Sequence, residues 1–256
     1  MQRSVLWVML AATLWGTTGT AAYFLGPDVS PLAIGAVTMG LGGALLALWG
    51  GTATLVIALG LGPLTAALLE WGVDRRRPSV SWWIASLAAL SGIALMAGAK
   101  VELGGGRMGN VALGVGLAAL AGLAYGTYTY VFGKLADRGH TPRAVAGGVF
   151  GAGAPVLLVV LVVTGAPLVA SPERVGLVAY LVLGPMVIGY LAFTAALRTL
   201  RASTVATIAL VEPVIATALA VLIVGEVLGY TAVVGIVLVS VSLVVFSTTR
   251  GPQLRA

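Results

Sequence analysis

The chain has 256 residues, of which 59% are hydrophobic and 9% are charged, and its formal net charge at pH 7 is +6. Soluble domains carry about 25% charged residues, so this composition excludes an ordinary soluble protein. The absence of cysteine excludes disulfide scaffolds, thiolate metal sites and cysteine nucleophiles. The basic residues lie in short loops between apolar runs. This pattern argues against a nucleic-acid partner and is typical of positive-inside topology in a lipid bilayer.

The apolar runs are close to 20 residues long, which is the length that spans a bilayer core, and clusters of Pro, Gly and charge separate them. Four membrane-spanning helices are predicted in the first half, at roughly 5–25, 31–49, 52–71 and 81–99. Five are predicted in the second half, at about 110–132, 144–165, 175–197, 203–224 and 229–247. The expected fold class is therefore an all-α polytopic membrane protein with about nine transmembrane helices.

An internal repeat relates the two halves. The motif WGTTG returns 110 positions later as YGTYT, and SP at 30–31 returns as TP at 141–142. Further along the offset becomes 150, which pairs Pro63 with Pro213. The change in offset predicts that the first half lacks 39 residues, or one helix with its connections. The predicted organisation is a shortened first repeat at 1–100, a Gly-rich link at 101–110 and a second repeat at 111–256.

Several motifs together resemble the EamA-like transporters of the drug/metabolite transporter (DMT) superfamily. They are LWGTTG (Leu14–Gly19), SP (Ser30 and Pro31), LGLGPLTAALLEW (Leu59–Trp71) before RRRPS, and EPV...GE (Glu212–Glu226). The resemblance implies a ten-helix inner-membrane carrier with two inverted five-helix repeats. It also implies a substrate cavity near the midplane and alternating access without ATP or a bound cofactor.

The absent helix departs from the family pattern. With nine spans, the first two helices would run parallel to their repeat partners, whereas an inverted-repeat cavity needs antiparallel partners. Three interpretations stay open: the first pair inserts backwards, residues 52–71 do not fully span, or the chain is a truncated product. The Lys/Arg distribution predicts a cytoplasmic C-terminus, because that orientation puts ten basic residues inside and four outside.

Glu212 is the strongest candidate functional residue, because it lies deep in its span, where a charge costs roughly 2.5 to 3.5 kcal/mol. It is expected to bind substrate or to couple protons, and the alternative is a protonated side chain that only packs. Pro213 and its counterpart Pro63 predict helix breaks on either side of a site between the halves, although simple kinks explain them equally well.

Two polar-aromatic stretches and one further span supply the other candidates. The candidate substrate-binding residues are Trp15, Thr17, Thr18, Tyr23, Tyr125, Thr127, Tyr128, Tyr190 and Thr194, together with Glu212. For the Thr and Tyr side chains, cavity lining and hydrogen bonding between helices are equally good interpretations.

These observations favour a secondary transporter that exports a small-molecule metabolite across the cytoplasmic membrane, with protons as a candidate coupling ion. An enzyme is disfavoured, because Glu212 has no ionisable partner within a span. No metal is expected, since the single His lies near no acidic cluster at ligand spacing. The alternative is a non-transporting, truncated paralogue with a structural role. Two shortened chains could complement one another as a homodimer, although no residue demands it.

Overall fold

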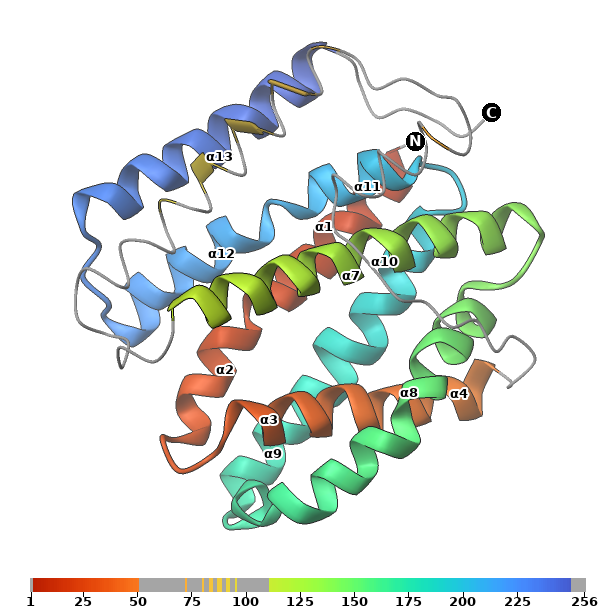
Figure 1. Ribbon diagram of the computed structural model, residues 1–256, viewed down its shortest axis with the longest axis vertical. Helices are drawn as coiled ribbons and strands as arrows, with labels where there is room; N and C mark the ends of the chain where they lie inside the picture. The colour runs from red at the N-terminus through yellow and green to blue at the C-terminus, as the bar shows by residue number, and fades with distance from the viewer. Residues whose placement is uncertain are drawn as a thin grey trace.

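The computed structural model describes residues 2–50 and 111–249, with isolated positions between them at 72, 80, 83–84, 87–88, 91–92 and 95. Every regular element in these residues is a helix (Figure 1), which confirms the predicted all-α class. The predicted span at 52–71, and all but isolated positions of the one at 81–99, lie outside the described residues. The count of nine spans therefore stays a prediction.

Within the described residues, the first half contributes two spans. They consist of α1 (Gln2–Gly16) with α2 (Thr18–Leu25), and of α3 (Pro31–Gly35), η1 (Ala36–Leu41) and α4 (Gly42–Gly50). The second half contains α7 (Val111–Asp137), α8 (Pro142–Thr164), η2 (Ala166–Val169), α9 (Pro172–Leu181), η3 (Val182–Gly189), α10 (Tyr190–Ala196), α11 (Ala202–Ala209), α12 (Glu212–Leu219), η4 (Ala220–Val224) and α13 (Tyr230–Thr249). Elements η1, η3 and η4 are π-helical, and η2 is a 3₁₀ turn.

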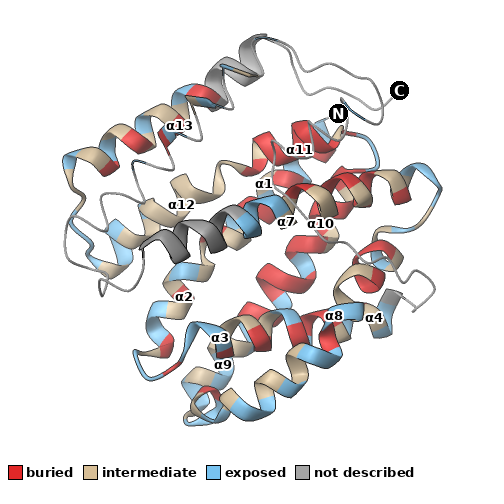
Figure 2. Ribbon diagram, in the orientation of Figure 1, coloured by how far each residue is buried: buried red, intermediate tan, exposed pale blue. Residues whose placement is uncertain are grey.

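Five described stretches are long and apolar enough to cross a membrane, and each matches a predicted span. They are Gln2–Leu25, Pro31–Trp49, Pro142–Thr164, Pro172–Ala196 and Ala202–Val224. Large apolar side chains on their outer faces are exposed, among them Leu48, Val162 and Leu222. Buried residues concentrate instead on the inner helices η3, α10 and α11 (Figure 2). An apolar exterior around a packed interior is what a lipid-embedded bundle requires.

The repeat is visible in how the second span of each half begins. Ser30 caps one helix by accepting a hydrogen bond from the backbone N–H of Ala33 at 3.1 Å, and Pro31 follows it. Thr141 caps α8 in the same way, accepting from the N–H of Ala144 at 3.3 Å. A hydroxyl N-cap followed by Pro is a strong helix start, so the two Ser/Thr-Pro pairs occupy equivalent positions.

Contacts at the two ends of the bundle fix the helix directions. At the first end, Thr199 donates a hydrogen bond from Oγ1 to Ser4 Oγ at 2.6 Å, which places the N-terminus beside the loop 197–201. At the second end, Arg174 binds Asp28 in the loop 26–30, with Nη2 2.7 Å from Oδ1. The span α1–α2 therefore runs from the first end to the second.

The same criteria orient the other repeat helices. The span Pro31–Trp49 returns to the first end, where the guanidinium of Arg143 lies 4.6 Å from the Trp49 ring centroid. Helix α8 thus starts at the first end, and α7 arrives there (Figure 1). Each described helix of the first half consequently runs antiparallel to its repeat partner. The parallel arrangement that nine spans would impose on the first pair is not what the structure has.

Two hydrophobic cores lie within the bundle, one toward each end. The first-end core includes Val8, Phe132, Phe193 and Leu200, all fully buried. The second-end core joins residues of the loop 26–30 and its flanking helices to residues of η2, α9 and η3, such as Leu168 and Val182. Between them lies the candidate site.

Candidate functional site

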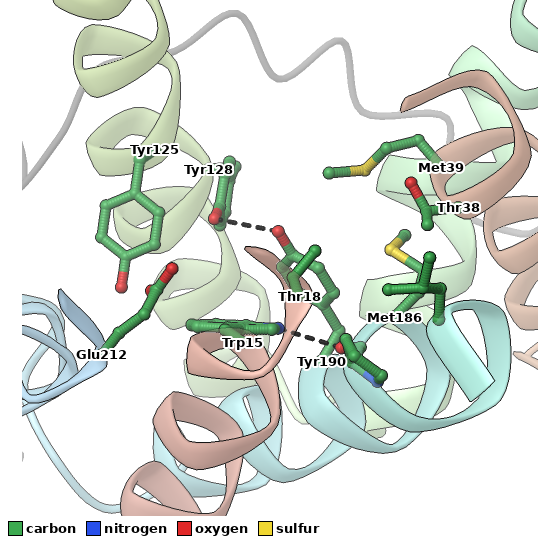
Figure 3. A pocket seen from close by; sticks show the side chains of 11 residues that line it. Trp15, Thr18, Thr38, Met39, Tyr125, Tyr128, Met186, Tyr190 and Glu212 are labelled. Carbon is green, nitrogen blue, oxygen red and sulfur yellow. Dashed lines mark hydrogen bonds between the residues drawn. The ribbon is translucent and has the colours of Figure 1, made fainter. Parts of the chain in front are cut away.

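A cavity of about 250 Å³ opens between the first and second halves of the chain (Figure 3). Its lining residues are Trp15, Thr18, Thr38, Met39, Tyr125, Tyr128, Leu181, Pro185, Met186, Tyr190 and Glu212. Tyr125 and Glu212 lie on one side, and Thr38, Met39 and Met186 lie on the other. Both cores contribute, since Leu181 belongs to the second-end core and Tyr190 to the first-end core.

Helix irregularities surround this cavity. The first span is interrupted at Thr17, between α1 and α2. The second and fourth described spans pass through the π-helical segments η1 and η3 where they line the cavity. Helix α11 ends at Ala209, and α12 begins at Glu212 with Pro213 in its first turn. π-Helical segments and broken helices are often found at functional sites because they redirect side chains and expose backbone groups.

Pro213 accounts for the last of these breaks. It has no backbone N–H, so the carbonyl of Ala209 loses its usual helical partner. The backbone turns instead through Leu210 and Val211, whose N–H groups bond to carbonyls three residues earlier at 3.1 Å each. The result is that Glu212 starts a new helix facing the cavity. Pro63, its predicted counterpart, lies outside the described residues.

Four aromatic rings form one continuous wall of the cavity, the aromatic wall of Trp15, Tyr125, Tyr128 and Tyr190. The Trp15 ring centroid lies 4.9 Å from that of Tyr190, and the Tyr125 and Tyr128 centroids are 5.2 Å apart. The Tyr128 and Tyr190 centroids are 6.0 Å apart. Such edge-to-face and tilted pairs add about 0.5–1.5 kcal/mol each beyond their burial, so the wall is held rigidly.

Trp15 also ties the first half to the second by a hydrogen bond. Its indole Nε1–H donates to the carbonyl of Pro185 at 2.9 Å. A Cβ at Gly189 would lie 2.9 Å from this Nε1, so glycine is needed there for the indole to approach. The bond crosses from α1 to η3 and fixes the orientation of the ring in the cavity.

The polar groups of the cavity differ in how fully they are satisfied. The Tyr128 and Tyr190 hydroxyls lie 3.3 Å apart and bond to one another, and Thr38 donates to the carbonyl of Ile34 in its own helix at 2.8 Å. The Tyr125 hydroxyl, in contrast, is buried and has no hydrogen-bond partner among the described residues. Buried polar groups without a partner are rare and costly, which makes this hydroxyl a candidate ligand contact beside Glu212.

The structure brings six of the ten predicted binding residues to one cavity: Trp15, Thr18, Tyr125, Tyr128, Tyr190 and Glu212. The other four lie outside the lining. Thr17 bonds to the Tyr180 hydroxyl at 2.5 Å, and Thr194 is fully buried and donates to the carbonyl of Tyr190. Tyr23 is 60% exposed on the outer surface. Thr127 is half-buried on α7.

Five lining residues were not among the sequence candidates: Thr38, Met39, Leu181, Pro185 and Met186. Two of them carried a usable signal, since Thr38 is the one hydroxyl-bearing residue in its span and Pro185 interrupts an apolar run. The Leu and Met residues of the lining could not be recognised from the sequence. Every face of these helices is apolar, so periodicity does not distinguish residues that face the cavity from residues that face lipid. Among the described residues, no group of His, Asp or Glu is arranged to hold a metal ion.

Comparisons with known proteins agree with the architecture. Residues 112–248 match the EamA-like transporter family. The uncharacterized transporter YwfM of Bacillus subtilis (strain 168) is 30% identical over 290 aligned positions, which cover 97% of this chain and 95% of that protein. An uncharacterized transporter of Clostridium kluyveri is 29% identical over 143 residues, covering 54% of this chain and 45% of that protein. A crystal structure of a protein 18% identical shares the fold, with a TM-score of 0.75 over 96% of this chain and 97% of that one.

The alignment with the Bacillus relative also bears on the length of the chain. It runs over 290 positions, whereas 97% of 256 residues is about 248. The relative therefore carries about 40 positions that this chain lacks within the aligned region. That number is close to the 39 residues that the change in repeat offset predicts to be missing, and the location of the gap in the first half stays a prediction.

Proposed function

Because the chain belongs to the EamA-like transporter family, we propose that it is a secondary transporter that exports a small organic metabolite across the cytoplasmic membrane by alternating access. The observation that carries this proposal is the cavity between the halves. Four of its lining residues come from the first half and seven from the second. A site built from both repeats can open to either side when the repeats move against one another.

The ends of the bundle suggest how access alternates. The second end is closed by the second-end core and by the bidentate ion pair of Arg174 with Asp28, with N–O distances of 2.7 and 2.8 Å. Arg174 also donates to the carbonyl of Pro167 at 2.9 Å. Since Asp28 belongs to the first half and Arg174 to the second, opening this end requires the pair to separate.

The charge distribution supports a cytoplasmic first end. Among the described residues, six basic side chains lie at that end: Arg3, Lys134, Arg138, Arg143, Arg198 and Arg201. Within the same residues, the second end has Arg174 alone. By the positive-inside rule we infer that the first end, with the N-terminus and the end of α13, faces the cytoplasm. Labelling of Val169→Cys from outside intact cells, with His140→Cys protected, would support this orientation, and the reverse pattern would contradict it.

The predicted loss of one helix from the first half favours a second candidate, a paralogue that no longer transports. Its basis is the difference of about 40 positions from the Bacillus relative. Against it, the described helices of the first half retain antiparallel partners and still supply Trp15, Thr18, Thr38 and Met39 to the cavity. We therefore retain transport as the main proposal.

Counterflow into proteoliposomes separates the two candidates. Vesicles would be tested with one organic cation, one amino acid and one carboxylate: choline, L-phenylalanine and phenylacetate. Transport predicts accumulation of at least one of them, lost in Glu212→Gln. It should persist in Glu173→Gln, a matched control whose exposed carboxylate lies at the start of α9. Absence of counterflow with all three compounds would favour the paralogue that does not transport.

A further inference from the structure

We infer that the cavity is built for a small organic monocation, an ammonium compound held between the Glu212 carboxylate and the aromatic wall. This inference deepens the proposed function and depends on it for the direction of movement only. The binding chemistry rests on the cavity itself, in which charge, ring surface and unsatisfied polar groups all favour a cation.

The charge of the lining is one-sided. Among the described lining residues, Glu212 is the one carboxylate, and none is Lys, Arg or His. An anionic cargo would meet a carboxylate and find no countercharge among these residues. A cation would supply the countercharge that a buried carboxylate needs.

The aromatic wall strengthens the preference. Ring faces attract cations through the quadrupole of the π system, and Trp is the best of them. Three wall residues already make hydrogen bonds, because the Trp15 N–H donates to the carbonyl of Pro185 and the Tyr128 and Tyr190 hydroxyls bond to each other. The Trp15 indole therefore offers the cargo its π surface alone, and the two tyrosines offer ring surface with the one O–H that their mutual bond leaves free. Ring surface predominates, which suits an organic cation.

The fourth residue of the aromatic wall is Tyr125, whose hydroxyl makes no hydrogen bond among the described residues. This hydroxyl is buried in a cavity that Glu212 also lines, and its oxygen can accept a hydrogen bond. An ammonium with an N–H group satisfies both oxygens, since it can donate to the hydroxyl and to the carboxylate. A quaternary ammonium satisfies the carboxylate and the rings alone, so the two kinds of cation should respond differently to loss of this hydroxyl.

The size of the cavity limits the cargo. Its volume of about 250 Å³ is just below the roughly 300–1,000 Å³ of pockets that take drug-sized ligands. The expected cargo is therefore a small amine or quaternary ammonium rather than an extended amphipathic cation.

Binding to the purified protein, measured by isothermal titration calorimetry, tests the inference with probes of matched shape. Choline, 3,3-dimethyl-1-butanol and 3,3-dimethylbutyrate share a branched head and differ in charge from +1 to 0 to −1. We expect choline to bind at least about tenfold more tightly than the other two. Equal or tighter binding of the neutral or anionic compound would overturn the inference.

Variants assign the preference to named side chains. Glu212→Gln should weaken choline binding at least about tenfold, and Glu212→Asp, which keeps the charge, should retain part of it. Glu173→Gln serves as the control. Tyr125→Phe should weaken binding of trimethylammonium, which has an N–H donor, and leave tetramethylammonium, which has no donor, unchanged, whereas Tyr23→Phe, on the outer surface, should change neither. Unchanged choline affinity in Glu212→Gln would overturn the inference.

The two proposals fail in different ways. Selective choline binding without counterflow would uphold the cation site and contradict transport. Counterflow of L-phenylalanine or phenylacetate without choline binding would uphold transport and overturn the cation site.

Discussion

The close approach of α4 and α8 predicts opposite effects for one substitution at two glycines of the same helix. A Cβ at Gly147 would clash with the backbone oxygen of Leu46 and lie 3.0 Å from its carbonyl carbon. Carbon atoms pack best at about 3.5–4.0 Å, so the helices would have to separate by roughly 0.5–1 Å. A Cβ at Gly153, six residues later in the same helix, meets nothing within 4 Å. Gly147→Ala should therefore be destabilising, and Gly153→Ala should not.

The difference between the two variants isolates the packing cost. Each variant gains about 1 kcal/mol from the higher helix propensity of Ala, and this gain cancels when the two variants are compared. The remaining difference is the cost of overpacking at Gly147, about 1–3 kcal/mol. At about 2–4 °C per kcal/mol for a protein near this size, the melting temperature of Gly147→Ala should lie about 2–12 °C below that of Gly153→Ala. Thermal unfolding in detergent at a fixed scan rate measures it. Equal melting temperatures, or a lower one for Gly153→Ala, would refute the close approach on which this reasoning rests.

Three further predictions follow from single contacts. Trp15→Phe should lower stability by about 1 kcal/mol, the net worth of one hydrogen bond, and a melting temperature equal to that of the wild type would contradict the bond to η3. The hydrogen bond from Arg174 holds the pKa of Asp28 below its usual value of 3.8. The ion pair therefore stabilises the fold fully at pH values above 3.8, and this stabilisation is lost as the pH falls through the lowered pKa. Asp28→Asn should thus melt below the wild type at neutral pH, with a gap that closes in acid; a gap independent of pH would refute the assignment. Gly16→Ala, whose Cβ would lie 3.1 Å from the backbone oxygen of Glu212, should slow counterflow, whereas Gly19→Ala, with nothing within 4 Å, should not; equal rates would count against precise placement of α12.

Much of the fold could be predicted because its signals are local. Apolar runs of bilayer length predicted the five described spans, and the Ser30-Pro31 and Thr141-Pro142 pairs predicted equivalent helix starts, since a hydroxyl cap and a Pro at the first position act within one turn. The directions of the first helices could not be predicted by counting spans from the cytoplasmic C-terminus. The count of nine spans is odd, whereas the family pattern has ten, and the charge count describes whole loops and not single helices. Long-range contacts such as that of Ser4 with Thr199 supply the directions.

The site residues that could be predicted are the polar and aromatic ones within otherwise apolar spans. Glu212, Trp15 and the tyrosines of α7 stand out in sequence because polar or aromatic groups within a span need partners. Met39 does not stand out, since it lies in the π-helical segment η1, which rotates the helix face and leaves no composition signal. Leu181, the last residue of α9, does not stand out because the run around it is apolar on every face. Thr194 was a reasonable candidate by type, but its hydroxyl is used within its own helix.

Two-sided access to the cavity is the central claim, and a single cysteine tests it most directly. The chain has no native cysteine, and Thr38 lines the cavity while its hydroxyl bonds within its own helix. Thr38→Cys would be treated with a membrane-impermeant thiol reagent in right-side-out and in inside-out vesicles, beside His140→Cys as a one-sided control. Alternating access predicts that Thr38→Cys is labelled in both kinds of vesicle, while the control is labelled in one. Labelling of Thr38→Cys from one side only would contradict the account.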